Sequence, residues 1–93
     1  MVRVKIRAFA LIREKLGWKE RELEVKARTL EDLLKAVKTV NGKNLYELIT
    51  DEGEIKSNFL VLLNGKEVGY LKGLKTRIKE GDAIFIFPPV SGG

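Results

Sequence analysis

The 93-residue sequence contains no cysteine and no histidine, and these two absences remove most of the side chains that perform enzymatic chemistry. Without cysteine there is no disulfide framework, no thiol nucleophile and no cysteine-based zinc or iron–sulfur site. Without histidine, the side chain that most often serves as a general base or metal ligand is also missing. We therefore expect a chain that is not catalytic alone, binds no cofactor and holds no metal.

Long apolar segments of the kind that enter membranes are also missing. Residues 1–7 alternate charged and apolar side chains, which is unlike a signal peptide or a membrane-spanning helix. The expected location is therefore cytoplasmic, with no membrane partner. A hydrophobic content of 44% beside 33% charged residues is typical of a globular fold. A chain of this length can build one modest core, so a single domain over residues 1–93 without a deep pocket is predicted.

The net charge of +5 raises the question of nucleic-acid binding. No aromatic-and-arginine motif or recognition helix accompanies the basic residues, and acidic residues are interspersed among them. This pattern therefore does not predict specific binding to nucleic acid. It is compatible with long-range electrostatic attraction of an acidic partner. The basic residues that are spread along the chain in this way include Arg3, Lys5, Arg7, Lys26, Lys38, Lys56, Lys72 and Lys79.

Hydrophobic periodicity predicts two strands and one helix in the first part of the chain. Residues 2–9 and 20–26 alternate apolar and polar side chains, which indicates two strands joined through a short helical turn that ends at Gly17. Thr29 precedes an apolar pattern at positions 30, 33, 34 and 37, which predicts a capped amphipathic helix. Asn41-Gly42 is predicted to end that helix.

The middle of the chain predicts a connecting segment followed by a hairpin. Residues 43–58 have a mixed pattern with about one helical turn. The apolar run 59–63 is typical of a buried strand, and Asn64-Gly65 is a strong hairpin signal, so residues 66–70 are predicted to form a short return strand.

The last predicted strand covers residues 83–87, between a turn at Gly81-Asp82 and a stop at Pro88-Pro89. The order of elements predicts an α+β fold, in which a mixed sheet of four or five strands carries one main helix on one face.

Alternation along the strands predicts that Phe9, Phe85 and Phe87 point away from the helix, because neighbouring side chains face opposite sides of a sheet. Two interpretations follow. The segment 43–58 could fold over these rings, or the rings could form an apolar docking patch for another protein.

The carboxyl terminus is the most informative segment. From Pro88 onward the chain could extend about 20 Å from the sheet, and the two prolines would stiffen its base, so residues 88–93 are predicted to form a flexible tail. Gly92 and Gly93 have no Cβ that could collide with the walls of a narrow channel, and the only reactive group at the tip is the α-carboxylate. The tail is therefore predicted to be a substrate for another protein, although an inert end is the plain alternative.

The sequence resembles the small subunits of molybdopterin synthase, which are ubiquitin-like sulfur carriers of the MoaD and ThiS superfamily. The resemblance covers nearly the whole length and implies a β-grasp fold. The segments that carry it are Phe9-Ala10-Leu11-Ile12-Arg13-Glu14, the capped helix from Thr29, Asn64-Gly65, Gly81-Asp82 and Phe87-Pro88-Pro89-Val90-Ser91-Gly92-Gly93.

The resemblance implies a two-stage cycle in which this chain carries sulfur. An adenylyltransferase similar to ubiquitin-activating enzymes would use ATP to adenylate Gly93, and a sulfur donor would convert the adenylate to a thiocarboxylate. The large subunit of molybdopterin synthase would then receive the tail. By position, Gly93 would be the modified residue, Gly92 and Ser91 would give access, and the residues that would contact partners are Phe9, Phe85, Phe87, Pro88, Pro89 and Val90.

Other interpretations remain open at this point. A carrier of the same fold could serve transfer-RNA thiolation or conjugate itself to protein lysines. The Pro-Pro-Val ending favours the molybdopterin interpretation over these two. A thiamine-type carrier shares the Gly-Gly terminus but tends to be shorter and to lack Pro-Pro, so it ranks below both. The chain could also be a binding module whose tail takes no part in chemistry.

Overall fold

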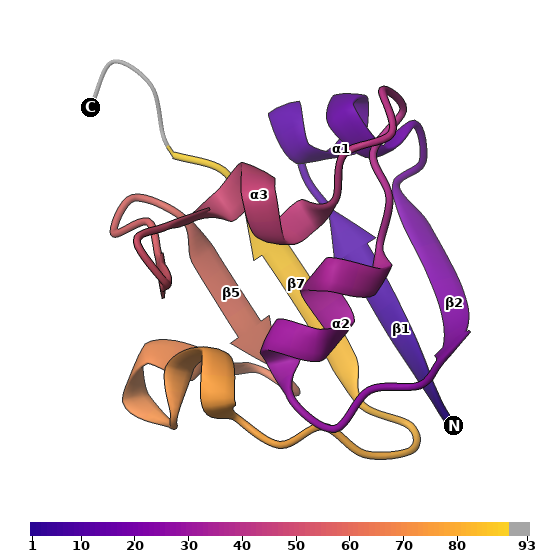
Figure 1. Cartoon of the computed structure of the whole chain (residues 1–93), viewed down its shortest axis with the longest axis vertical. Coiled ribbons are helices and arrows are strands. Elements are labelled where there is room, and N and C mark those ends of the chain that lie inside the picture. Colours follow the sequence, from indigo (N-terminus) through magenta and orange to yellow (C-terminus); the bar gives the residue numbers. More distant parts are fainter. Residues whose placement is uncertain (90–93) are drawn as a thin grey trace.

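The computed structural model describes residues 1–89 of the chain. The sequence predictions for Val90, Ser91, Gly92 and Gly93 therefore lie outside the described residues. Five strands form one sheet in the order β2-β1-β7-β5-β6 (Figure 1). Their bounds are β1 Val2–Ala8, β2 Glu20–Val25, β5 Leu60–Leu63, β6 Lys66–Glu67 and β7 Ala83–Phe87.

The sheet is mixed, because β1 and β7 are parallel while the other neighbouring pairs are antiparallel. Helices α2 (Leu30–Ala36) and α3 (Leu45–Ile49) lie across one face of it, and α1 (Leu11–Leu16) follows β1 (Figure 1). The mixed five-stranded sheet with helices on one face is the predicted β-grasp arrangement, which confirms the fold class.

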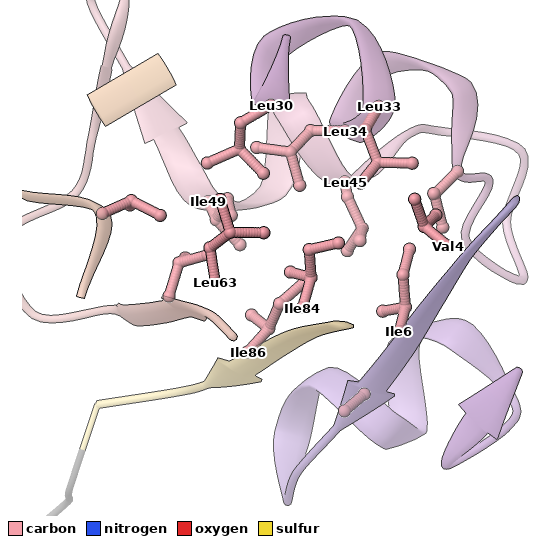
Figure 2. Packing of buried hydrophobic residues seen from close by; sticks show 14 of the residues in the cluster. Val4, Ile6, Leu30, Leu33, Leu34, Leu45, Ile49, Leu63, Ile84 and Ile86 are labelled. Carbon is pink, nitrogen blue, oxygen red and sulfur yellow. The ribbon is translucent and has the colours of Figure 1, made fainter. Parts of the chain in front are cut away.

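The core lies between the sheet and these helices. Apolar side chains from both layers meet there, and Ile6, Ile84 and Leu33 are fully buried (Figure 2). Because the strands alternate, the other face of the sheet contributes nothing to this core. The labelled side chains of Figure 2 are Val4, Ile6, Leu30, Leu33, Leu34, Leu45, Ile49, Leu63, Ile84 and Ile86.

The main helix is shorter than predicted. A capping box begins it, since the Thr29 hydroxyl accepts from the Asp32 amide at 3.3 Å and the Asp32 carboxylate accepts from the Thr29 amide at 3.3 Å. The prediction that Asn41-Gly42 ends it was wrong, because the helix ends at Ala36 and Val37 is already extended. The amide of Leu45 donates to the carbonyl of Val37 at 2.9 Å, so pairing with the α3 segment ends α2 early.

Two further boundaries differ from the prediction. The return strand predicted for residues 66–70 is only β6, because the chain turns into the 3₁₀ helix η1 (Val68–Tyr70), whose Val68 side chain is buried. A second 3₁₀ helix, η2, covers Gly73–Lys75. In the segment 43–58, the predicted helical turn is α3, and the small hairpin of β3 (Thr50–Asp51) and β4 (Glu54–Ile55) follows it.

Candidate functional site

The strand that leads to the carboxyl terminus is held on both sides. β7 lies between β1 and β5, and its last residue, Phe87, pairs with Leu60. On the other side the amide of Phe9 donates to the carbonyl of Ile86 at 3.2 Å. Pro88 and Pro89 then follow, and neither can donate a backbone hydrogen bond to a neighbouring strand. Backbone pairing on both sides therefore holds β7 in place up to Phe87, the residue after which residues 88–93 follow in the sequence.

The three phenylalanines lie together on the sheet face opposite the helices. The Phe9 and Phe87 rings are stacked, with centroids 4.2 Å apart, and the Phe85 ring is tilted against Phe9 at 6.0 Å. All three side chains are only partly buried, whereas Ile84 and Ile86, which alternate with Phe85 and Phe87 along β7, are fully buried in the core. The predicted side of the sheet is confirmed for all three rings.

Two leucines that were not predicted from the sequence extend this apolar area. Leu60 pairs with Phe87 and Leu62 pairs with Phe85, so both side chains lie on the face of the phenylalanines. Leu60 is 36% exposed. Because residues 59–63 are all apolar, the sequence does not show which of them face the core and which face the other side of the sheet. The register with β7 makes this assignment. We call Phe9, Leu60, Leu62, Phe85 and Phe87 the tail-base surface.

The segment 43–58 does not cover the tail-base surface. Leu45 and Ile49 of α3 are fully buried in the core, on the other side of the sheet. Of the two interpretations offered by the sequence, folding of this segment over the rings is therefore wrong. The tail-base surface remains partly exposed in the described structure.

The neighbouring half of the same face is charged. Along β1 and β2, basic and acidic residues stand directly opposite one another, as in the pairs Arg3 with Glu24 and Arg7 with Glu20. These two pairs have N–O distances of 3.6 Å and 3.8 Å and are exposed, so they add little stability. Arg7 also lies over the Phe9 ring at 5.5 Å. This row of balanced charges marks the boundary of the tail-base surface.

The chemistry available at the tail-base surface is limited to contact. Its side chains are all hydrocarbon, so they can bind an apolar partner surface but cannot transfer protons. Within residues 1–89, no group of three acidic side chains that could hold a metal ion is present. The same residues contain no helix long and apolar enough to cross a membrane.

Comparison with known proteins places this geometry in a family. The model of the ThiS family matches residues 6–93, which is nearly the whole sequence. The chain belongs to the ThiS family. The recognised superfamily, that of ubiquitin-like sulfur carriers, is thereby confirmed, and the match extends through the segment after Phe87.

Members and neighbours of the ThiS family carry different names. The chain is 38% identical to small archaeal modifier protein 3 of Haloferax volcanii, over 97% of this chain and 98% of that protein. It is 31% identical to a candidate sulfur carrier protein of Archaeoglobus fulgidus, over 77% of this chain and 82% of that protein. A candidate molybdopterin converting factor subunit 1 from Pyrococcus furiosus has the same fold, with a TM-score of 0.71, 26% identity and coverage of 97% and 100%.

Proposed function

We propose that this ThiS family protein carries sulfur as a thiocarboxylate on Gly93 and donates it in molybdopterin synthesis, as the small subunit of molybdopterin synthase. The observation that carries the proposal is the ending Phe87-Pro88-Pro89-Val90-Ser91-Gly92-Gly93 directly after a strand that is paired on both sides. An anchored strand followed by a narrow glycine terminus suits delivery of a carboxylate into another protein's active site.

The tail-base surface would supply the docking contact for both enzymes that act on the tail. Its rings and leucines lie beside Phe87, where residues 88–93 begin. A partner that binds this surface therefore also stands next to the emerging tail. Aromatic side chains contribute much of the binding energy at protein interfaces, and Phe9 and Phe87 are partly exposed rings of this kind.

The chemistry follows from the reactivity of a carboxylate. In the first step a Gly93 carboxylate oxygen attacks the α-phosphorus of ATP on the activating enzyme, and pyrophosphate leaves. In the second step a sulfide-level donor attacks the carbonyl carbon of the acyl adenylate, and AMP leaves. The product is a thiocarboxylate. The carrier contributes the carboxylate and its presentation, while the partners supply the catalytic groups, in agreement with a chain that has no cysteine or histidine.

Protein conjugation is the second candidate function, and the Haloferax volcanii relative favours it. That protein is named a modifier and aligns with this chain over almost the whole of both sequences. In this case the activated carbonyl carbon of Gly93 would be attacked by a lysine amine, AMP or a thiol would leave, and an isopeptide bond would form. The two functions share the activated tail, but the carrier transfers its sulfur to the acceptor, whereas the modifier transfers the Gly93 acyl group itself.

An acceptor experiment separates the two functions. The Gly93 thiocarboxylate form of the protein is mixed with a molybdopterin synthase large subunit and the cyclic pyranopterin monophosphate precursor, and molybdopterin is quantified. The control is the same protein with an ordinary Gly93 carboxylate. Molybdopterin formed only with the thiocarboxylate supports the proposal. No molybdopterin beside a competent control carrier, together with Gly93 isopeptides on lysines in a cell extract, would instead favour conjugation.

A further inference from the structure

A second surface lies at the other end of the sheet from the tail-base surface. A groove of about 490 Å³ is bounded by the turn after β5 and by the segment that runs from η1 to the start of β7. In Figure 1 this region, at the bottom of the view, is where β5 ends and β7 begins, whereas Phe87 ends the β7 arrow at its other end. We call this hollow the far-end groove.

Four cationic side chains line the far-end groove: Lys66, Lys72, Arg77 and Lys79. All four residues are exposed. The ion pairs found in residues 1–89 involve Arg3, Arg7 and Lys35 and none of these four. Along the sequence acidic residues are interspersed among the basic ones, but the fold gathers these four cations around one hollow.

The one acidic side chain that lines the far-end groove, Asp82, already accepts hydrogen bonds from within the protein. Asp82 is 3% exposed, and its carboxylate oxygens accept hydrogen bonds from the Asn64 side-chain amide at 2.9 Å and the Lys79 backbone amide at 2.8 Å. Since this carboxylate is directed into the protein, it offsets only part of the positive charge. The groove therefore presents net positive charge to solvent.

Further hydrogen bonds join the segments that form the walls of the far-end groove. The Asn64 side-chain oxygen accepts from the Ala83 amide at 2.9 Å, which joins the turn after β5 to the start of β7. The Thr76 hydroxyl accepts from the Lys72 amide at 3.1 Å across the opposite wall. A hollow whose walls are fixed before binding loses less conformational entropy when a ligand enters it.

The apolar part of the far-end groove is aliphatic. Leu63, which is largely buried, and Leu71, which is 41% exposed, contribute its hydrocarbon surface. An aliphatic side chain of a ligand would cover the exposed part of Leu71 and remove it from water. Among the described residues, no aromatic side chain lines the groove, so the stacking contacts that single-stranded nucleic acids use are missing there.

We propose that the far-end groove binds an acidic peptide segment of a partner protein that carries a leucine-type side chain. Its carboxylates would pair with the four cations, and its aliphatic side chain would pack on Leu71. The charge complementarity selects an acidic occupant, and the aliphatic floor selects a peptide over a nucleic acid. This interaction goes beyond the sulfur-carrier function, because it requires neither Gly93 nor any activated carboxyl group.

The far-end groove and the tail-base surface lie at opposite ends of β7, so two proteins could bind the carrier at the same time. β7 has five residues and therefore spans about 17 Å between the groove and Phe87. A partner held at the groove leaves the tail-base surface free for a second protein. The same carrier could thus be retained by one protein while another acts on its carboxyl terminus.

The test uses the full chain and three fluorescein-labelled octapeptides in fluorescence anisotropy titrations. The first has two central leucines flanked by glutamates, the second replaces the leucines by alanine, and the third replaces the glutamates by glutamine. Labelled oligouridine is titrated as a nucleic-acid probe. Saturable binding of the first peptide, with weaker binding of both others and of oligouridine, is the expected result.

Two variants of equal charge locate the binding. The double variant Lys72→Glu and Arg77→Glu reverses two groove cations, and the control Lys26→Glu and Lys38→Glu reverses two exposed lysines elsewhere. Because each exposed ion pair contributes a factor of about 1.4 to 5, the loss of two pairs should make the groove variant bind the first peptide between about twofold and 25-fold more weakly than the control. Leu71→Ser, which leaves all charges in place, should also weaken that binding.

Three outcomes would overturn the proposal. They are no saturable binding of the leucine-containing acidic peptide, equal binding by the groove variant and the control variant, and tighter binding of oligouridine that the groove variant loses. Amide shifts in two-dimensional NMR spectra provide an independent location, expected around Lys72 and Arg77 and absent around Phe9. Formation of the Gly93 thiocarboxylate should be the same for both charge variants, so failure of this proposal is distinguishable from failure of the carrier function.

Discussion

Phe9 and Phe87 lie face to face, with ring centroids 4.2 Å apart and ring planes 9° apart, although they come from opposite ends of the sequence. The contact joins the residue that follows β1 to the last residue of β7. The backbone reinforces it, since the Phe9 amide donates to the carbonyl of Ile86 at 3.2 Å. The point from which the carboxyl-terminal segment continues is therefore fixed by an aromatic pair on the exposed side of the sheet.

The first prediction concerns this aromatic pair. Phe87→Asp should weaken binding to the activating enzyme strongly, because it places a charge in the middle of an apolar docking surface. The loss of the Phe9 stack should destabilise the fold by about 1 kcal/mol, which lowers the melting temperature by about 4–8 °C. Binding is measured by titration calorimetry and stability by thermal unfolding.

The matched control for that variant is Tyr70→Asp. Tyr70 is 87% exposed and lies outside the tail-base surface, so the same type of change there should leave binding to the activating enzyme unaltered. If Phe87→Asp unfolded the protein while its remaining folded fraction bound the enzyme normally, Phe87 would be a core residue and the docking role would be wrong.

The second prediction concerns Ala10, which follows Phe9 and has a φ of 49° and a ψ of −124°. A residue with a Cβ is strained in this region, whereas glycine adopts it freely. Ala10→Gly should therefore stabilise the protein by about 0.5–1 kcal/mol despite the greater freedom of glycine in the unfolded chain. Chemical denaturation with urea measures the change.

The comparison variant is Ala36→Gly at the last residue of α2, where the same substitution should destabilise by about 0.5–1 kcal/mol. Opposite signs at the two positions are the expected pattern. Destabilisation at both positions would mean that Ala10 does not hold the strained conformation in solution.

The third prediction concerns pH and the capping box of α2. Hydrogen bonds from the backbone amides of Arg28 and Thr29 hold the pKa of the Asp32 carboxyl below its ordinary value of 3.8. A lowered pKa in the folded state means that the charged carboxylate stabilises the fold above the ordinary pKa. This contribution is lost as the pH falls through the folded-state pKa.

The measurement compares the melting temperatures of the natural chain and Asp32→Asn over the acid range. The natural chain should be the more stable at neutral pH, and the difference should shrink as the pH falls below about 4. A difference that stayed constant down to about pH 2 would show that the charge of Asp32 does not contribute.

The fourth prediction concerns the terminal glycine. Deleting Gly93 should abolish adenylation, because the carboxylate would then stand one residue short of its reactive position. Within residues 1–89 the buried core residues lie between Val4 and Ile86, and a terminal residue usually contributes little packing, so the melting temperature should change little. Thermal unfolding and a pyrophosphate-release assay test the two halves of this prediction. A large loss of stability would contradict a terminus that serves only as a substrate.

The sequence predicted the parts of the fold that rest on clear periodicity. The alternation of β1 and of β7 placed Phe9, Phe85 and Phe87 on the correct face, and Thr29 marked the start of α2. The end of α2 was missed because Val37 pairs with the α3 segment, a contact distant in sequence. The return strand was predicted too long because Val68, whose side chain is buried, begins the 3₁₀ helix η1 directly after β6.

The surfaces were harder to predict than the elements. Leu60 and Leu62 belong to the tail-base surface because they pair with Phe87 and Phe85 of β7. The uniformly apolar segment 59–63 gives no sign of this in the sequence. The four cations of the far-end groove are separated along the sequence and meet only through the turns around η1 and η2. Alternation and composition describe one strand or the whole chain, so they carry no information about such clusters.

The central claim is that Gly93 becomes a thiocarboxylate, and the intact mass of the protein tests it most directly. The full chain is incubated with ATP, an activating enzyme of the ThiS family's pathway and sulfide, and the product is fragmented to locate the change. An oxygen-to-sulfur mass increment confined to Gly93, dependent on ATP, is the predicted result. An unchanged mass beside a carrier that the same enzyme does convert would contradict the account.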